Sequence, residues 1–253
     1  MSDSLAKITV SLPDNTSREY NKGVTPYEVA LDIGEGLAKA SLAAEVNGTL
    51  VDLSIPIEAD VSCKLLTVRD DESLDLIRHD TAHVLAEAAK ELWPDIQVTI
   101  GPVIKDGFYY DFAREAPFTP EDLVALEDRM REIVDRDEPI TREVWGRQEA
   151  LEFFASIGES YKAEIVRDLP EDEVLTVYKQ GKFVDLCRGP HLPSTGKLGT
   201  AFKLTRIAGA YWRGDSQNEM LQRVYGTAWA SEKDLRSYLD RLEEAARRDH
   251  RRL

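Results

Sequence analysis

LDLIRHDTAHVLAEAAKEL, which spans residues 74–92, is the stretch around which the rest of the chain is arranged. Its apolar residues recur at the spacing of a helix with one buried side, and Trp93-Pro94 follows where such a helix should end. His79 and His83 are four residues apart, so this helix places both imidazoles on one face, one turn from each other. The two rings can then point into one space.

A second stretch carries side chains of the same kind. DLCRGPH, residues 185–191, comes at the end of an expected strand and holds Cys187 and His191 four positions apart. The chain has four histidines and two cysteines, and these two stretches contain three of the histidines and one of the cysteines. The imidazole chemistry available near neutral pH is therefore concentrated in them.

Length and composition bound the class of protein. A chain of 253 residues with 42% hydrophobic residues can form one large domain or two ordinary ones with real cores. It has no apolar run long enough to cross a membrane and no signal-peptide pattern at its start, so we expect a cytoplasmic protein without a membrane partner. The net charge of −15 argues against a general binder of nucleic acids. Residues 206–253 are the exception, with ten Lys and Arg against eight Asp and Glu.

Residues 1–68 form the first expected unit. Alternation over residues 7–12 predicts a strand, and a turn and a second strand should follow. Thr25-Pro26 has the pattern of a helix start, with apolar residues continuing the helix to residue 40. Asn47-Gly48 predicts a hairpin turn, and residues 65–68 close the unit. The result is a small mixed sheet over one helix, with Cys63 buried in its core.

The polar residues 69–73 separate this unit from a larger one, in which helices and short strands follow one another. The pattern predicts an α+β fold with a mainly antiparallel sheet. We expect helices from residues 74, 119, 148, 161 and 231, and strands over residues 98–103, 107–112, 141–145, 175–178, 182–186, 202–208, 210–212 and 221–227.

Three interpretations of the histidine and cysteine stretches stay open from the residues alone. In the first, three imidazoles and one thiol form a tetrahedral zinc site. In the second, a metal-free pocket hydrolyses a substrate: a histidine activates water, Lys162 or another histidine stabilises charge, and Asp185 orients a partner or binds an ammonium group. In the third, these side chains only pack in the structure. No motif requires Cys187 to be a covalent nucleophile.

Five motifs resemble a known family. They closely resemble the N-terminal region of bacterial-type threonyl-tRNA synthetase, in the order of that family and over essentially the whole chain. The motifs are RHDTAH at 78–83, GFYYDF at 107–112, DLCRGPH at 185–191, AGAYWRGD at 208–215 and MLQRVYGTAW at 220–229.

The resemblance implies a division into domains. Residues 1–68 are similar to a TGS domain, a ubiquitin-like β-grasp, and residues 69–240 are similar to an editing domain that deacylates tRNA. Residues 241–253 resemble the end of a linker helix toward an aminoacylation core. We expect a fragment without that core and without aminoacylation activity, and the family implies a homodimer of the full-length form through the core.

The implied reaction is proofreading hydrolysis of seryl-tRNA(Thr) at the tRNA 3′ end, with threonyl-tRNA(Thr) left intact. An aminoacylation site for threonine cannot fully exclude serine, because one methyl group is worth roughly 1–3 kcal/mol of discrimination. Two alternatives remain: a zinc-dependent deacylase of the alanyl type that acts in trans, and a non-catalytic tRNA-binding module.

The resemblance also implies site residues. Lys162 and His79 would position or activate water and the terminal ribose, while His191 and Asp185 hold the seryl group. Lys197-Leu198-Gly199 departs from the family pattern, which puts the pocket rim in question. The expected catalytic residues are His79, His83, Lys162, Asp185, Cys187 and His191. The expected substrate-binding residues are Tyr109, Asp185, Arg188 and His191. We expect no metal or other cofactor; the ligands of an alternative zinc ion would be His79, His83, Cys187 and His191.

Overall fold

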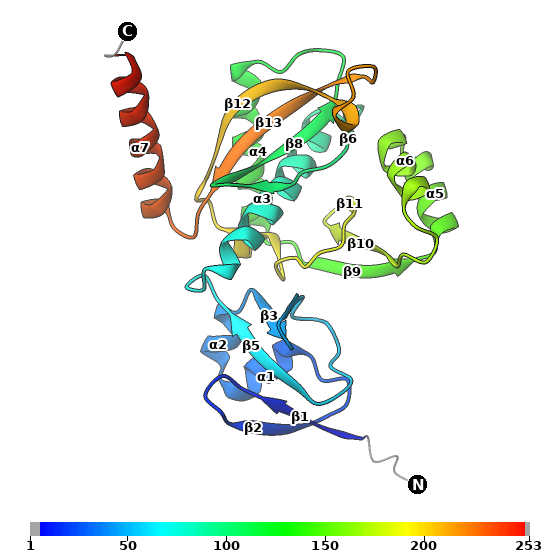
Figure 1. Ribbon diagram of the computed structural model, residues 1–253, viewed down its shortest axis with the longest axis vertical. Helices are drawn as coiled ribbons and strands as arrows, with labels where there is room; N and C mark the ends of the chain where they lie inside the picture. Colours follow the sequence, from blue (N-terminus) through cyan, green and yellow to red (C-terminus); the bar gives the residue numbers. More distant parts are fainter. Residues whose placement is uncertain (1–5, 251–253) are drawn as a thin grey trace.

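The computed structural model describes residues 6–250, and its N-terminal part is a five-stranded mixed sheet (Figure 1). The strand order is β2-β1-β5-β3-β4, in which β1 and β5 are parallel and the other neighbours are antiparallel. Ile8 and Val10 alternate with exposed residues along β1, and they pack with Cys63 in the core under the sheet. The strands are β1 (Lys7–Ser11), β2 (Ser17–Asn21), β3 (Ala43–Val46), β4 (Thr49–Val51) and β5 (Val61–Leu66).

The single helix expected after Thr25 is wrong, because two helices stand there. Thr25 caps α1 (Pro26–Ile33) in a capping box with Glu28, as the motif predicts. Gly34 then adopts extended backbone angles, which end α1 before α2 (Glu35–Ala40) begins. Glycine has a low helix propensity, so the helix breaks there. Asn47 and Gly48 both have positive φ, as the predicted hairpin turn requires.

The larger part of the chain is built around α3 (Glu72–Leu92), which is buried along most of its length. An antiparallel sheet of order β12-β13-β8-β6 covers one side of α3, and α4 (Pro120–Arg136) packs beside it (Figure 1). The sheet consists of β6 (Gln97–Val98), β8 (Gly107–Ala113), β12 (Phe202–Tyr211) and β13 (Met220–Ala228), with β7 (Val103–Ile104) paired to β8. The exposed helix α7 (Glu232–His250) follows β13.

The larger part of the chain also contains a second antiparallel sheet, of order β11-β10-β9. Its strands β10 (Leu175–Gln180) and β11 (Phe183–Leu186) form the hairpin that the sequence predicts, and β9 (Ile140–Trp145) pairs with β10. Helices α5 (Arg147–Ser156) and α6 (Ser160–Asp168) pack together between β9 and β10 in the chain. The predicted α+β class with mainly antiparallel pairing is confirmed.

Two expected strands differ from the structure. Residues 98–103 are split into β6 and β7, because Pro102 has no N–H to donate and Gly101 lies directly against the Tyr110 ring. The break expected near Gly209 is absent: β12 is continuous, and Gly209 pairs with Gln222 of β13. Among the described residues, no helix is both long and apolar enough to pass through a lipid bilayer.

A buried carboxyl on α3 gives the fold a pH dependence that can be measured. Glu87 is 2% exposed and accepts a hydrogen bond from the Gln180 amide (2.7 Å), and burial raises its pKa to about 7. A carboxyl whose folded pKa lies above its unfolded value stabilises the fold at low pH, and this contribution is lost as pH rises through about 7.

We therefore expect Glu87→Gln to raise the melting temperature relative to the parent at pH 8, and much less at pH 5. The gain at pH 8 should reach about 3 kcal/mol, since each pKa unit corresponds to about 1.4 kcal/mol. Thermal unfolding across pH 5–8 measures it, with Glu132→Gln, whose side chain is 65% exposed, as the control. A difference from the parent that does not change with pH would contradict the expectation.

Candidate functional site

The structure brings the two histidine and cysteine stretches together. One ligand atom from each of four residues lies within 4.8 Å of the other three; these residues, called the His/Cys cluster below, are His79, His83, Cys187 and His191. Nε2 of His79 is 3.2 Å from Sγ of Cys187. The centroids of the three imidazole rings are 4.5–4.8 Å apart.

Local structure explains how each half of the cluster is presented. His79 and His83 lie one turn apart on α3, as their spacing predicts. Cys187 follows β11, where its N–H donates to the Thr176 carbonyl and its sulfur accepts from the N–H of Gly189. Gly189 has a φ of +70° and lies against the Tyr178 hydroxyl, so a side chain at this position would be both strained and in collision. The turn therefore depends on glycine.

His191 is held by a carboxylate from α3. Its Nδ1 is 2.6 Å from Oδ1 of Asp80, and the N–H of Leu192 donates to Oδ2 of the same carboxylate (2.7 Å). Burial lowers the pKa of His191, but the charge and hydrogen bond of Asp80 outweigh burial and raise the pKa above its ordinary value. Asp80 thus favours the imidazolium form and fixes the ring, which leaves Nε2 for contacts within the cluster.

A buried ion pair lies beside the cluster. Nζ of Lys162, on α6, is 2.5 Å from Oδ1 of Asp185, on β11, and both side chains are at most 4% exposed. Oδ2 of Asp185 is 3.3 Å from Nδ1 of His83 and 3.4 Å from the Tyr110 hydroxyl. Burial, followed by the charge of His191, lowers the pKa of His83 and so favours its neutral form. Asp185 therefore connects the buried Lys162 to the His/Cys cluster.

The two cysteines have opposite properties. Burial alone raises the pKa of Cys63 to about 11, so this thiol stays protonated in the N-terminal core. Burial also opposes ionisation of Cys187, but the surrounding imidazoles of His191, His79 and His83 outweigh it and lower the pKa of this thiol. Cys187 is only partly buried, and Nε2 of His79 is the ring nitrogen within hydrogen-bond distance of its sulfur.

The donor set fits a zinc ion. Three imidazoles and one thiolate are ligands that zinc prefers, and four such groups match a tetrahedral site. In two of the histidines the Nδ1 atom already faces a carboxylate: His83 faces Asp185 and His191 faces Asp80. Carboxylates placed in this way orient metal-binding histidines in many proteins.

Comparison with known proteins identifies two domains in the chain. Residues 8–67 match the TGS domain, and residues 175–225 match the threonyl and alanyl tRNA synthetase second additional domain. The chain is similar to the threonine–tRNA ligases of Rhodospirillum rubrum (61% identity over 246 residues), Hyphomonas neptunium (62% over 247) and Thiobacillus denitrificans (62% over 247). The chain therefore carries a TGS domain and a second additional domain of the kind found in threonyl and alanyl tRNA synthetases. It is covered to 97% by each alignment but spans only 38%, 38% and 39% of these three relatives.

Two residues expected to bind substrate have side chains that point away from the His/Cys cluster. Tyr109 faces the side of β8 opposite to Tyr110, where it packs against Arg223 and Tyr225. Side chains alternate along a strand, so Tyr110 is the one that reaches Asp185. Arg188 is next to Cys187, but its side chain is 78% exposed and pairs with Glu173. Arg188 and Cys187 both line a cavity of about 270 Å³.

The segment Lys197-Leu198-Gly199, which departs from the family pattern, lies at the contact between the two domains. Residues 195–198 form a 3₁₀ turn in which Leu198 is buried, and the Lys197 ammonium donates to the Lys39 carbonyl of the TGS domain. Lys197-Leu198-Gly199 therefore joins the two domains. Residues of the site that sequence reasoning missed are Asp80, Tyr110, Tyr178 and Asp52. Only Asp80 carried a signal, because it lies between the two histidines in the motif.

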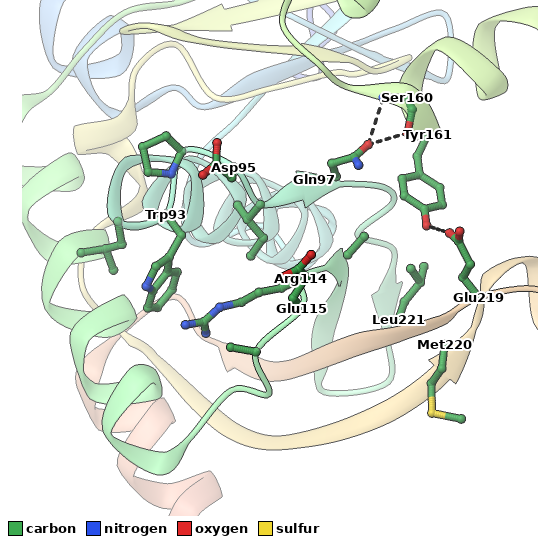
Figure 2. Close-up of a pocket in the computed structure, with 15 residues that line it drawn as sticks. Trp93, Asp95, Gln97, Arg114, Glu115, Ser160, Tyr161, Glu219, Met220 and Leu221 are labelled. Carbon is green, nitrogen blue, oxygen red and sulfur yellow. Dashed lines mark hydrogen bonds between the residues drawn. The ribbon is translucent and has the colours of Figure 1, made fainter.

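A larger cavity, of about 790 Å³, lies apart from the cluster in the larger part of the chain (Figure 2). Trp93 and Arg114 stack on one side of it, and Tyr161 reaches Glu219 on the other (Figure 2). Tyr161 immediately precedes Lys162 on α6. The same helix therefore contributes one residue to this cavity and one to the ion pair beside the His/Cys cluster.

Proposed function

We propose that this chain hydrolyses seryl-tRNA(Thr) to serine and tRNA(Thr) and leaves threonyl-tRNA(Thr) intact. The observation that carries the proposal is the buried lysine–aspartate pair joined to the His/Cys cluster. It lies in a domain that the threonyl and alanyl tRNA synthetases share. A tRNA-related editing role fits this domain, and the ester at the tRNA 3′ end is a bond that water can break.

The reaction needs one water molecule and no redox partner. The water oxygen adds to the seryl carbonyl and the ester C–O bond breaks. One water proton goes to the ribose oxygen, and the other is released to solvent as serine leaves as a carboxylate. We assign water activation to His79, because its side chain is more accessible than those of His83 and His191. Lys162 balances the negative charge that develops on the ester and ribose oxygens. Asp185 and His191 form the polar floor that holds the seryl group.

Selectivity follows from size. Serine and threonine differ by one methyl group, and a synthetic site cannot reject the smaller amino acid by more than about 1–3 kcal/mol. A closely packed second site can admit serine and exclude the larger side chain by steric overlap. Loss of labelled serine from seryl-tRNA(Thr), measured against spontaneous loss of the ester in buffer, tests the proposal. A rate equal to the spontaneous rate would contradict it.

A zinc-dependent deacylase is the second candidate, supported by the four donor atoms within 4.8 Å. His79, His83, Cys187 and His191 would hold the ion, which when bound supplies a Lewis acid and acidifies a water molecule. Our proposal is the metal-free reaction, in which Nε2 of His79 contacts the Cys187 sulfur and Asp80 holds His191. Metal analysis of the purified chain separates the two candidates: stoichiometric zinc would contradict the metal-free reaction.

The charge of the chain predicts weak binding of tRNA. Affinity for nucleic acid depends mainly on neutralised phosphates, and the net charge here is −15. We expect this chain to bind tRNA(Thr) weakly, with an affinity that falls as salt rises. Titration of labelled tRNA(Thr) at two salt concentrations measures this. A dissociation constant below micromolar at physiological salt would contradict the expectation.

A further inference from the structure

The TGS domain reaches into the site through one side chain. Asp52 follows β4 in the TGS domain and is 8% exposed. Its Oδ2 accepts a hydrogen bond from the Tyr178 hydroxyl (2.7 Å), and its Oδ1 accepts one from the backbone N–H of His191 (2.7 Å). Both partners belong to the second additional domain, so a single carboxylate joins two points of the site to the other domain.

The two partners of Asp52 touch the reactive residues directly. The Tyr178 ring lies against the His191 imidazole, with centroids 4.1 Å apart. Tyr178 stands opposite Asp185 in the β10–β11 pairing, and its hydroxyl lies against Gly189 in the turn between Cys187 and His191. A shift of the Tyr178 hydroxyl or of the His191 backbone would therefore move that turn.

We propose that Asp52 is a positioning residue of the hydrolytic site, and that the TGS domain thereby holds residues 187–191 in the geometry that the reaction needs. This inference rests on the proposed function. The Thr176 carbonyl holds the N–H of Cys187 at the start of this loop, and Asp80 holds its end, at His191 and Leu192. Asp52 adds a restraint from the TGS domain, on the N–H of His191 and on the Tyr178 hydroxyl that lies against Gly189. Catalysis depends on such restraints because misplacement by about 1 Å can reduce a rate about 100-fold.

The test compares three variants of the whole chain. Asp52→Ala removes both acceptors, and we expect kcat for seryl-tRNA(Thr) to fall about 10- to 100-fold with little change in KM. Asp52→Asn should restore most of the rate, because its amide oxygen can accept from His191 and its NH₂ can donate to the Tyr178 oxygen. Asp32→Ala is the matched control, since Asp32 pairs with Arg18 on the exposed surface of the same domain. It should keep the parent rate.

Two further measurements keep the inference decidable if Asp52→Ala is poorly folded or the parent is inactive. Tyr178→Phe keeps the ring but removes one hydrogen bond, and it should lower kcat by less than Asp52→Ala does. NMR signals of the His191 ring report the position of the loop without any hydrolysis, and they should move in Tyr178→Phe and Asp52→Ala but not in Asp32→Ala. A parent chain without hydrolytic activity would contradict the proposed function, while the NMR signals would still test whether Asp52 positions the loop. Unchanged kcat and unchanged His191 signals in the Asp52 and Tyr178 variants would overturn the positioning role.

Discussion

Lys162→Met is expected to lose both hydrolysis and stability. Its ammonium is 2.5 Å from the Asp185 carboxylate in a site where both side chains are at most 4% exposed. Removing one partner of a buried ion pair leaves the other charge without compensation and typically costs about 3–5 kcal/mol. The rate of seryl-tRNA(Thr) hydrolysis should fall about 100-fold or more, because the group that balances the developing negative charge is gone. Denaturant unfolding and a single-turnover hydrolysis assay measure the two effects.

A second variant separates these two roles of Lys162. Lys162→Met combined with Asp185→Asn removes both charges, so it should recover much of the lost stability while hydrolysis stays lost. The exposed Lys182→Met serves as the control for replacing a lysine in general and should behave like the parent. Recovery of hydrolysis in the double variant would show that Lys162 only balances Asp185 and takes no part in the reaction.

His79→Ala is expected to slow hydrolysis strongly with little effect on stability. Its imidazole is only partly buried, and its Nε2 contacts the sulfur of Cys187. Loss of a general base typically lowers a rate about 10²- to 10⁴-fold. Single-turnover hydrolysis and thermal unfolding of the same preparation measure the two quantities.

His79→Gln sharpens this test, because glutamine can form hydrogen bonds but cannot take up a proton at neutral pH. It should be as slow as His79→Ala. A non-catalytic tRNA-binding module makes the opposite prediction, namely that function survives the loss of His79. Parent-like hydrolysis in His79→Gln would assign His79 to positioning and would remove it as the base.

The parts of the site that could be predicted are those with local causes. The i,i+4 spacing of His79 and His83 fixes their relation on any helix, and the turn at Gly181-Lys182 fixes the hairpin that leads to Cys187. The zinc-like donor set follows from residue types alone. The prediction that only folding can test is that these stretches meet, and the structure places them within 4.8 Å.

The residues that could not be predicted depend on packing between distant segments. Whether Tyr109 or Tyr110 faces the site is decided by the register of β8 against β13, and neighbouring residues on a strand face opposite ways. Asp52 had no signal at all, because its role arises from the contact of one domain with the other. The break at Gly34 has a local cause, but the apolar spacing continues across it, so the sequence indicated one helix instead of two.

The measurement that tests the central claim most directly is hydrolysis of seryl-tRNA(Thr) and threonyl-tRNA(Thr) by this chain, side by side, with a metal chelator present. We expect rapid loss of serine from seryl-tRNA(Thr), loss of threonine from threonyl-tRNA(Thr) no faster than in buffer alone, and no effect of the chelator. Equal hydrolysis of both esters would contradict the size selection. Loss of activity in chelator that returns with added zinc would contradict the metal-free reaction.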